Sequence, residues 1–361
     1  MNSIIVSLYL MTEKRDIRNF SLDELTSFFT EKGEAAFRAK QVYQWLWQKR
    51  ALNFDQMTNL SQELRNFLSD NFVIRAVEIS EMQISRDKTI KCAMRLYDGN
   101  VVESVLIPTE DRMTACISSQ VGCSLTCKFC ATGKLKRMRN LNADEIFDQV
   151  VLVRDAANQH YGQRLSNIVY MGMGEPLLNY NEVIRSVEKI TSPSGLGMSP
   201  QRITLSTAGV AKMIHRLGDE KVKFNLALSL HAANDEKRNQ IMPINETNSL
   251  DNLIAALNHF YECTGTRVTL EYIAFKDFND SLMDAKELVE FSRRVKSKIN
   301  IIEYNPIENS DFQQTTGERL EAFKKLLESN GVIVNVRKSR GKDIDAACGQ
   351  LANKNKLSLA G

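Results

Sequence analysis

Apolar positions in the first seventy residues recur at the spacing of a helix. Val42, Trp45 and Leu46 fall at i, i+3 and i+4, the spacing of one helix face. The run that begins at Ser21 opens with Ser-Leu-Asp-Glu, the pattern of a capping box. We therefore expect a small helical domain over residues 1–75.

The pattern changes to alternation between about Val77 and Pro108. Two strands are predicted here, Ile90–Leu96 and Val101–Ile107, separated by a turn at Asp98-Gly99-Asn100. We interpret residues 76–110 as a linking β-hairpin extension.

Downstream of residue 110, short apolar strand patterns alternate with helical patterns. Strands are expected at 114–118, 167–171, 202–206, 224–230, 268–275, 299–302 and 332–336, and helices are expected to begin at Ala143, Tyr180, Val210, Ser249, Ser281 and Gly317. This alternation is typical of a parallel sheet covered by helices. Six or seven such units favour an α/β fold of the partial (β/α)6-type TIM barrel over a doubly wound sheet. We assign this barrel to residues 111–351 and a polar tail to 352–361.

Functional residues of such barrels lie at the C-terminal ends of the strands. Motifs that follow predicted strands are Cys123–Cys130, Gly172–Pro176, Ser206–Gly209, Ser229–His231 and Glu303–Pro306. We expect all of them to meet at one mouth of the barrel.

Cys123, Cys127 and Cys130 offer three thiolates at a compact spacing. A structural zinc site needs four protein ligands, and an ordinary iron–sulfur electron carrier uses four cysteines. Three cysteines leave one iron open to a substrate or cofactor. The alternative is a zinc knuckle with a fourth ligand such as His160 or Cys116.

The other strand-end motifs offer groups that suit a nucleoside-like cofactor. Gly174 lets backbone approach a ligand closely, and Glu175 or the neighbouring carbonyls could hold an amine, although glycines after a strand are often only a turn. The hydroxyls of Ser206 and Ser229 suit a ribose or carboxylate, although each could be a helix cap. Asn305 is equally well explained as a ligand-binding amide or a turn residue.

Two further cysteines and a glutamate are candidates for a chemical role, whereas a histidine at a strand end is not. Cys348 lies in a glycine-flanked polar segment that could carry a thiol to the mouth, and Cys116 in the first barrel strand could face the interior, so the two could form a transient disulfide. Glu103 is a carboxylate in an apolar strand, explained as well by solvent exposure as by a general base. His231 could be a plain strand-end histidine, and we assign it no proton transfer.

Composition excludes several classes of protein. The chain has 361 residues, of which 43% are hydrophobic and 25% charged, which argues against disorder or a fibrous design. Seven cysteines, three of them clustered, do not form the dense pattern of a secreted disulfide scaffold. We expect neither a signal peptide nor a transmembrane helix, and a cytoplasmic location.

Charge is distributed unevenly although the net charge is only +3. Residues 128–139 hold five basic side chains and no acidic one, and 337–342 form a second basic group. In the N-terminal domain, Arg38, Lys40, Lys49 and Arg50 accompany Trp45 and Trp47. That combination could bind nucleic acid, but solvated charges around a tryptophan-anchored core explain it more simply.

The motifs together resemble a known family. Cys-x3-Cys-x-Phe-Cys resembles the radical S-adenosylmethionine signature, and Gly-Met-Gly-Glu-Pro, Ser-Thr-Ala-Gly, Ser-Leu-His and the segment Arg340–Leu351 resemble the RlmN/Cfr family of RNA adenine methyltransferases. The likeness runs from about Phe37 to Leu351. Lys136-Arg137 stands where the family often has Gly-Phe.

The resemblance implies a [4Fe-4S] cluster on Cys123, Cys127 and Cys130, and two molecules of S-adenosylmethionine per turnover. The residues that it implies for holding this cofactor are Gly174, Glu175, Ser206, Ser229, Leu230, His231 and Asn305. It also implies that Cys348 carries the methyl group into a covalent protein–RNA intermediate, that Cys116 resolves this intermediate by forming a disulfide, and that Glu103 accepts a proton.

The implied substrate is C2 of an adenine in 23S rRNA and in tRNA. A C8-specific Cfr-like enzyme and a different radical enzyme are the alternatives. Further expectations are an electron donor such as flavodoxin or ferredoxin, no membrane partner, and a monomer.

Overall fold

The computed structural model describes residues 14–353. The signal-peptide prediction and most of the predicted polar tail therefore concern residues outside the described part. The chain divides into two compact units, one formed by the residues up to Val77 together with Glu188–Met198, and the other by the remainder. Within 14–353, no helix combines the length and the apolar character needed to cross a bilayer.

The first unit is built on three helices, α1 (Leu22–Glu31), α2 (Phe37–Trp47) and α3 (Gln62–Asn71). A short parallel pair joins β1 (Arg15–Asp16) to β2 (Phe72–Val73). The predicted capping box is present, because the Ser21 hydroxyl accepts from the Glu24 amide and the Glu24 carboxylate accepts from the Ser21 amide. Trp47 is buried, as expected for a tryptophan-anchored core.

The second unit holds one ten-stranded sheet, in the order β14-β13-β12-β11-β10-β9-β6-β5-β4-β3. Seven of its strands run parallel: β6 (Met113–Cys116), β9 (Asn167–Tyr170), β10 (Ile203–Thr207), β11 (Asn225–Ser229), β12 (Val268–Ala274), β13 (Ser297–Glu303) and β14 (Val334–Arg337). Each lies within two residues of its predicted position. The partial-barrel prediction is confirmed.

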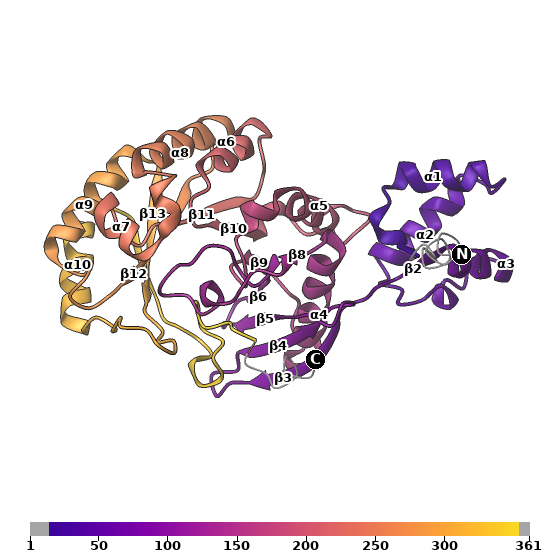
Figure 1. The fold of residues 1–361 in the computed structure, drawn as a ribbon, viewed down its shortest axis with the longest axis horizontal. Helices are drawn as coiled ribbons and strands as arrows, with labels where there is room; N and C mark the ends of the chain where they lie inside the picture. Colours follow the sequence, from indigo (N-terminus) through magenta and orange to yellow (C-terminus); the bar gives the residue numbers. More distant parts are fainter. Residues whose placement is uncertain (1–13, 354–361) are drawn as a thin grey trace, which may run out of the picture. The chain divides into compact units, whose positions relative to one another are not determined.

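Helices connect these strands and lie outside the curved sheet (Figure 1). They are α4 (Ala143–Tyr161), α5 (Tyr180–Thr191), α6 (Ala211–Asp219), α8 (Leu250–Thr264), α9 (Leu282–Arg294) and α10 (Gly317–Ser329). Local signals set their ends: Ser281 and Asp284 form a capping box at the start of α9, and Gly265 closes α8 at φ +68°. The short α7 (Asp235–Ile241) was not predicted.

The predicted hairpin extension is part of the same sheet. Strands β3 (Glu78–Ile84), β4 (Ile90–Arg95) and β5 (Val101–Pro108) are antiparallel, and β5 pairs with β6. This pairing covers an edge of the parallel strands that would otherwise expose unpaired backbone groups. The extension therefore continues the barrel sheet.

Candidate active site

A cavity of about 230 Å³ lies where the parallel strands end. Its lining includes ten of the thirteen sequence-predicted site residues: Cys116, Cys123, Cys127, Cys130, Gly174, Glu175, Ser206, Ser229, His231 and Cys348. Glu103, Leu230 and Asn305 are not among the lining residues. Strand-end placement therefore brings most of the predicted motifs to one mouth.

The three clustered cysteines share one loop and interact electrostatically. Burial, together with the neighbouring thiols Cys130 and Cys123, raises the pKa of Cys127. Burial likewise raises the pKa of Cys123 to about 11. Metal binding requires thiolates, so a cation at this position would favour the ionised form that the protein alone disfavours.

The zinc-knuckle alternative finds no support from His160. That histidine is an exposed residue of α4 and does not line the cavity. Cys116, the other alternative fourth ligand, does line it.

The backbone conformation and the close neighbours of residue 174 both require a glycine. Its φ is +95°, and a Cβ there would lie 2.5 Å from the Gln120 Cβ. The adjacent Glu175 is buried, and its carboxylate accepts hydrogen bonds from the amides of Ala208 (2.7 Å) and Leu177 (3.0 Å). Burial raises the pKa of Glu175, and these hydrogen bonds oppose the rise. Glu175 thus ties the loops after β9 and β10 together at the cavity wall.

Ser206 and Ser229 lie on neighbouring parallel strands and face each other. Their hydroxyl oxygens are 3.4 Å apart. Neither is a helix cap, because α6 and α7 are capped by Val210 and Asn234. Two adjacent hydroxyls on a cavity wall can both donate to and accept from a polar ligand.

His231 is buried and neutral. Burial, and the nearby Arg238 cation, lower its pKa to about 3. Its Nδ1 accepts from the Ile273 amide over 3.1 Å, so the ring proton lies on Nε2. The ring meets Phe129 edge-on at 4.7 Å. Leu230 is buried, and its carbonyl oxygen accepts a hydrogen bond from the Arg238 side chain. Leu230 therefore contributes to the site through its backbone carbonyl.

Cys348 and Cys116 reach the same cavity from distant parts of the chain. Burial of the thiol raises the pKa of Cys348 to about 11, although the residue as a whole is exposed. Burial, and then the charge of the Cys348 thiolate, raise the pKa of Cys116 to about 12. The Cys348 loop is bonded to the cysteine loop, because the Ala131 amide donates to Gly349 and the Thr132 hydroxyl donates to Leu351, each over 2.7 Å.

Sequence reasoning missed Arg337 and Glu271 as a pair in the cavity wall. Their side chains are 3.5 Å apart, and both line the cavity. The Arg337 cation opposes the raised pKa of both Cys116 and Cys348. Glu271 could have been found by the argument used for Glu103, since it too is a carboxylate within an apolar strand.

Glu103 is buried and does not line the cavity. One carboxylate oxygen accepts from the amides of Ala352 (2.9 Å) and Asn353 (3.1 Å), and the other lies 3.3 Å from the Lys91 amine. The structure therefore places Glu103 as an anchor for the segment that follows the Cys348 loop.

Comparison with known proteins identifies the family. A family model described as the ribosomal RNA large subunit methyltransferase N-terminal domain matches residues 15–74, and the radical SAM superfamily model matches residues 117–290. A probable dual-specificity RNA methyltransferase RlmN from Cytophaga hutchinsonii is 61% identical over 342 residues, covering 95% of this chain and 94% of the relative. The chain belongs to the RlmN family.

Other members of the RlmN family are also similar along most of the chain. The dual-specificity RNA methyltransferase RlmN of Nitratidesulfovibrio vulgaris is 46% identical, covering 93% of this chain and 94% of the relative. The crystal structure of a radical SAM methyltransferase from Sphaerobacter thermophilus superposes with a TM-score of 0.88 at 38% identity, covering 93% of this chain and 99% of that one. The chain is thus a radical S-adenosylmethionine methyltransferase of the RlmN family.

The cofactors of this family, a [4Fe-4S] cluster and S-adenosylmethionine, fit the cavity chemically. Three thiols at one wall suit a cluster with one open iron. The cradle at Gly174 and the paired hydroxyls of Ser206 and Ser229 suit a small polar ligand beside it.

Proposed function

We propose that this enzyme methylates C2 of an adenine in 23S rRNA and in tRNA. The observation that carries the proposal is that Cys116 and Cys348 line the same cavity as the three clustered cysteines. The dual-specificity names of the relatives from Cytophaga and Nitratidesulfovibrio support both RNA substrates. Their high identity favours C2 over the C8 chemistry of the alternative branch.

Cys123, Cys127 and Cys130 would ligate the cluster, and S-adenosylmethionine would lie beside it. The residues proposed to surround that cofactor are Gly174, Glu175, Ser206, Ser229, Leu230, His231 and Asn305. Bound there, the two cofactors supply the methyl group and the radical that removes a hydrogen atom from it. Neutral His231 contributes an Nε2–H donor without adding positive charge near the sulfonium.

Cys348 would carry the methyl group, because it lies on a loop and lines the cavity. Cys348 must first gain a methyl group and then lose a hydrogen atom from it, so one turnover consumes two molecules of S-adenosylmethionine. The carbon radical then bonds to adenine, and the adduct returns one electron to the electron-transfer chain and loses the proton of the ring carbon. The substrate is then joined to the Cys348 sulfur through the former methyl carbon.

Cys116 would release the product. Its thiolate attacks the Cys348 sulfur, a sulfur–sulfur bond forms, and the carbon–sulfur bond breaks; the released carbon keeps the electron pair and takes up a proton, which completes the methyl group of the base. The disulfide must be reduced by a thiol before the next turnover. Glu103 would accept the proton from the adenine carbon, which requires the segment Ala352–Asn353 to leave its carboxylate.

The partners follow from this chemistry. Basic residues of segment 128–139 would contact RNA phosphates, which position a strand without reading its sequence. The N-terminal helices are a second candidate RNA surface, since Lys49 lies 3.7 Å over the Trp45 ring there. The electron donor would be flavodoxin or ferredoxin, and we propose that the enzyme acts as a monomer in the cytoplasm, where ribosomal RNA and tRNA occur.

Two cysteine variants test this function against transcripts of 23S rRNA and tRNA. Cys348→Ala should retain the cluster absorbance and lose all methylation, whereas Cys116→Ala should accumulate a covalent protein–RNA species visible on a denaturing gel. Cys263→Ser is the matched control, because Cys263 lies outside the cavity. Methylation by Cys348→Ala protein would overturn the proposal.

Nucleoside mass spectrometry against synthetic 2-methyladenosine and 8-methyladenosine tests the position of methylation. We expect only the C2 product from both RNAs. A C8 product would assign the chain's activity to the alternative.

A further inference from the structure

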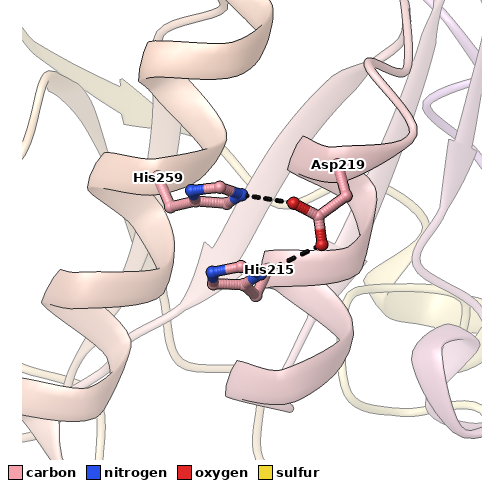
Figure 2. A group of neighbouring side chains, drawn as sticks. All are labelled: His215, Asp219 and His259. Atoms are coloured by element: carbon pink, nitrogen blue, oxygen red, sulfur yellow. Dashed lines mark hydrogen bonds and ion pairs between the residues drawn. The ribbon is translucent and has the colours of Figure 1, made fainter.

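Two outer helices of the barrel carry a cluster of metal-binding side chains that is separate from the cavity. His215 and Asp219 are four residues apart on α6, and His259 and Cys263 are four residues apart on α8. This spacing places each pair on one helix face. Figure 2 shows the Asp219 carboxylate beside the two imidazoles and hydrogen-bonded to both, with His259 coming from the other helix. None of the four residues lines the cavity.

The donor atoms of three residues converge. The Asp219 carboxylate oxygens lie 2.8 Å from His259 Nε2 and 3.2 Å from His215 Nδ1. One donor atom from each of the three lies within 4.8 Å of the others. The two imidazole rings stack with centroids 3.6 Å apart and planes 6° from parallel. Both rings therefore turn a nitrogen toward the same carboxylate.

These separations match a small tetrahedral metal centre. With zinc bonds of about 2.0–2.1 Å to nitrogen and oxygen, neighbouring ligand atoms are roughly 3.3 Å apart. The two observed nitrogen–oxygen distances, 2.8 and 3.2 Å, are close to that value, although each involves a different oxygen of Asp219. Because the rings stack in parallel, at least one imidazole must rotate before both nitrogens can point at one ion. Two imidazoles and one carboxylate suit zinc and similar transition metals, whereas calcium and magnesium prefer oxygen ligands alone.

A feature of the helix packing allows this close approach. Gly218 lies between the ligands of α6, and a Cβ there would be 2.8 Å from the His259 ring. The absence of a side chain at this position lets His259 lie against α6. The cluster also holds two of the chain's four histidines. His215 and Asp219 are about half exposed, so an ion could enter from solvent.

We propose that His215, Asp219 and His259 bind a zinc ion that fastens α6 to α8, with water completing its coordination. Cys263 lies beside the site, its sulfur 3.6 Å from His259 Nε2, but it is outside the group of three converging donors. Binding to the folded chain alone would stabilise the fold: at a free zinc concentration one hundred times Kd, the unfolding equilibrium shifts about 100-fold. The site would act on stability and leave the chemistry of the cavity unchanged.

The test uses untagged enzyme with its cluster intact, because an empty cysteine trio would itself bind zinc. Competition with a chelating dye should give one zinc per chain at micromolar or tighter Kd, and zinc should raise the melting temperature while iron content stays constant. The double variant His215→Ala/His259→Ala should lose at least 100-fold in affinity and the thermal shift. His160→Ala is the matched control, since it removes an exposed histidine elsewhere, and it should behave as wild type.

The site is refuted if the wild type binds no zinc below about 100 μM, or if the double variant binds as tightly as the wild type. The variant Cys263→Ser tests whether the thiol contributes to binding, and we expect it to change the zinc affinity by less than tenfold. A loss in Cys263→Ser as large as that in the double variant would overturn the three-ligand assignment.

Discussion

The side-chain amide of Asn305 donates a hydrogen bond to the carbonyl oxygen of Cys348 over 3.2 Å. Asn305 is buried, and its Oδ1 has no hydrogen-bond partner among residues 14–353. Pro306 follows and biases the Asn305 backbone toward an extended conformation. Asn305 therefore holds the loop that presents Cys348 and keeps one acceptor available.

Replacing Asn305 should loosen the Cys348 loop. Asn305→Ala removes a hydrogen bond worth about 1 kcal/mol, so we expect a roughly fivefold fall in single-turnover methylation rate. Hydrogen exchange of residues 345–353 should become faster. Asn305→Asp should be worse than Asn305→Ala, because a carboxylate cannot donate to the Cys348 carbonyl and repels it. Equal rates for Asn305→Asp and wild type would contradict this role.

Glu103 and Lys91 form a buried ion pair, so breaking it should cost stability. Glu103→Gln leaves the Lys91 amine buried without its counter-charge, and we expect a loss of about 3–5 kcal/mol in the free energy of unfolding. Urea denaturation measures this loss. Lys91→Met combined with Glu103→Gln should recover much of it, because neither charge remains. If Glu103→Gln unfolds at the wild-type urea concentration, the anchoring role is wrong.

Gly174 should tolerate no side chain. Gly174→Ala places a Cβ against Gln120 in a backbone conformation that L-residues rarely adopt, so we expect at least a tenfold loss in S-adenosylmethionine affinity by calorimetry. Gly162→Ala is the matched control: its φ is also positive, at +61°, but no atom lies within 4 Å of the added Cβ. That control should lose only about 1 kcal/mol of stability and keep its affinity.

His231 should make the fold sensitive to acid. Its folded-state pKa of about 3 lies below the ordinary value of 6.5, so the unfolded chain takes up the proton first. Stability from this residue is complete above pH 6.5 and is lost as the pH falls toward 3. When the pH falls from 7 to 5, the free energy of unfolding, measured by urea denaturation, should fall by about 2 kcal/mol less in His231→Gln than in the wild type. Identical losses in the two proteins would show that His231 ionises normally.

The spacing of apolar residues located most helices and strands, because it reflects which face of each element is buried. The strands from Met113 to Arg337 and most of their helices could be predicted, since each buries one face in a parallel sheet. The short helix α7 escaped prediction because seven residues leave little room for a period. The third antiparallel strand, β3, and the pairing of β5 with β6 depend on a partner far along the chain, which local pattern does not report.

The part of the candidate site that lies at strand ends could be predicted from the sequence. Ser206, Ser229 and Gly174 are strand-end residues, and all three line the cavity. Glu103 shows the limit: a carboxylate in an apolar strand signals a special environment, but the signal does not say whether the partner is a substrate, a lysine or a distant backbone amide. The pairing of Arg337 with Glu271 escaped notice for the same reason.

The sequence by itself determined the chemistry of this protein, because the spacing of Cys123, Cys127 and Cys130 and the order of the strand-end motifs are local properties of the chain. Tertiary structure alone decided which distant groups act together. It brought Cys348 to Cys116 and His259 to His215, and it turned Glu103 toward the backbone beyond Cys348. The physical reason is that burial and long-range packing set pKa values, hydrogen-bond partners and exposure, and these depend on contacts that sequence spacing does not encode.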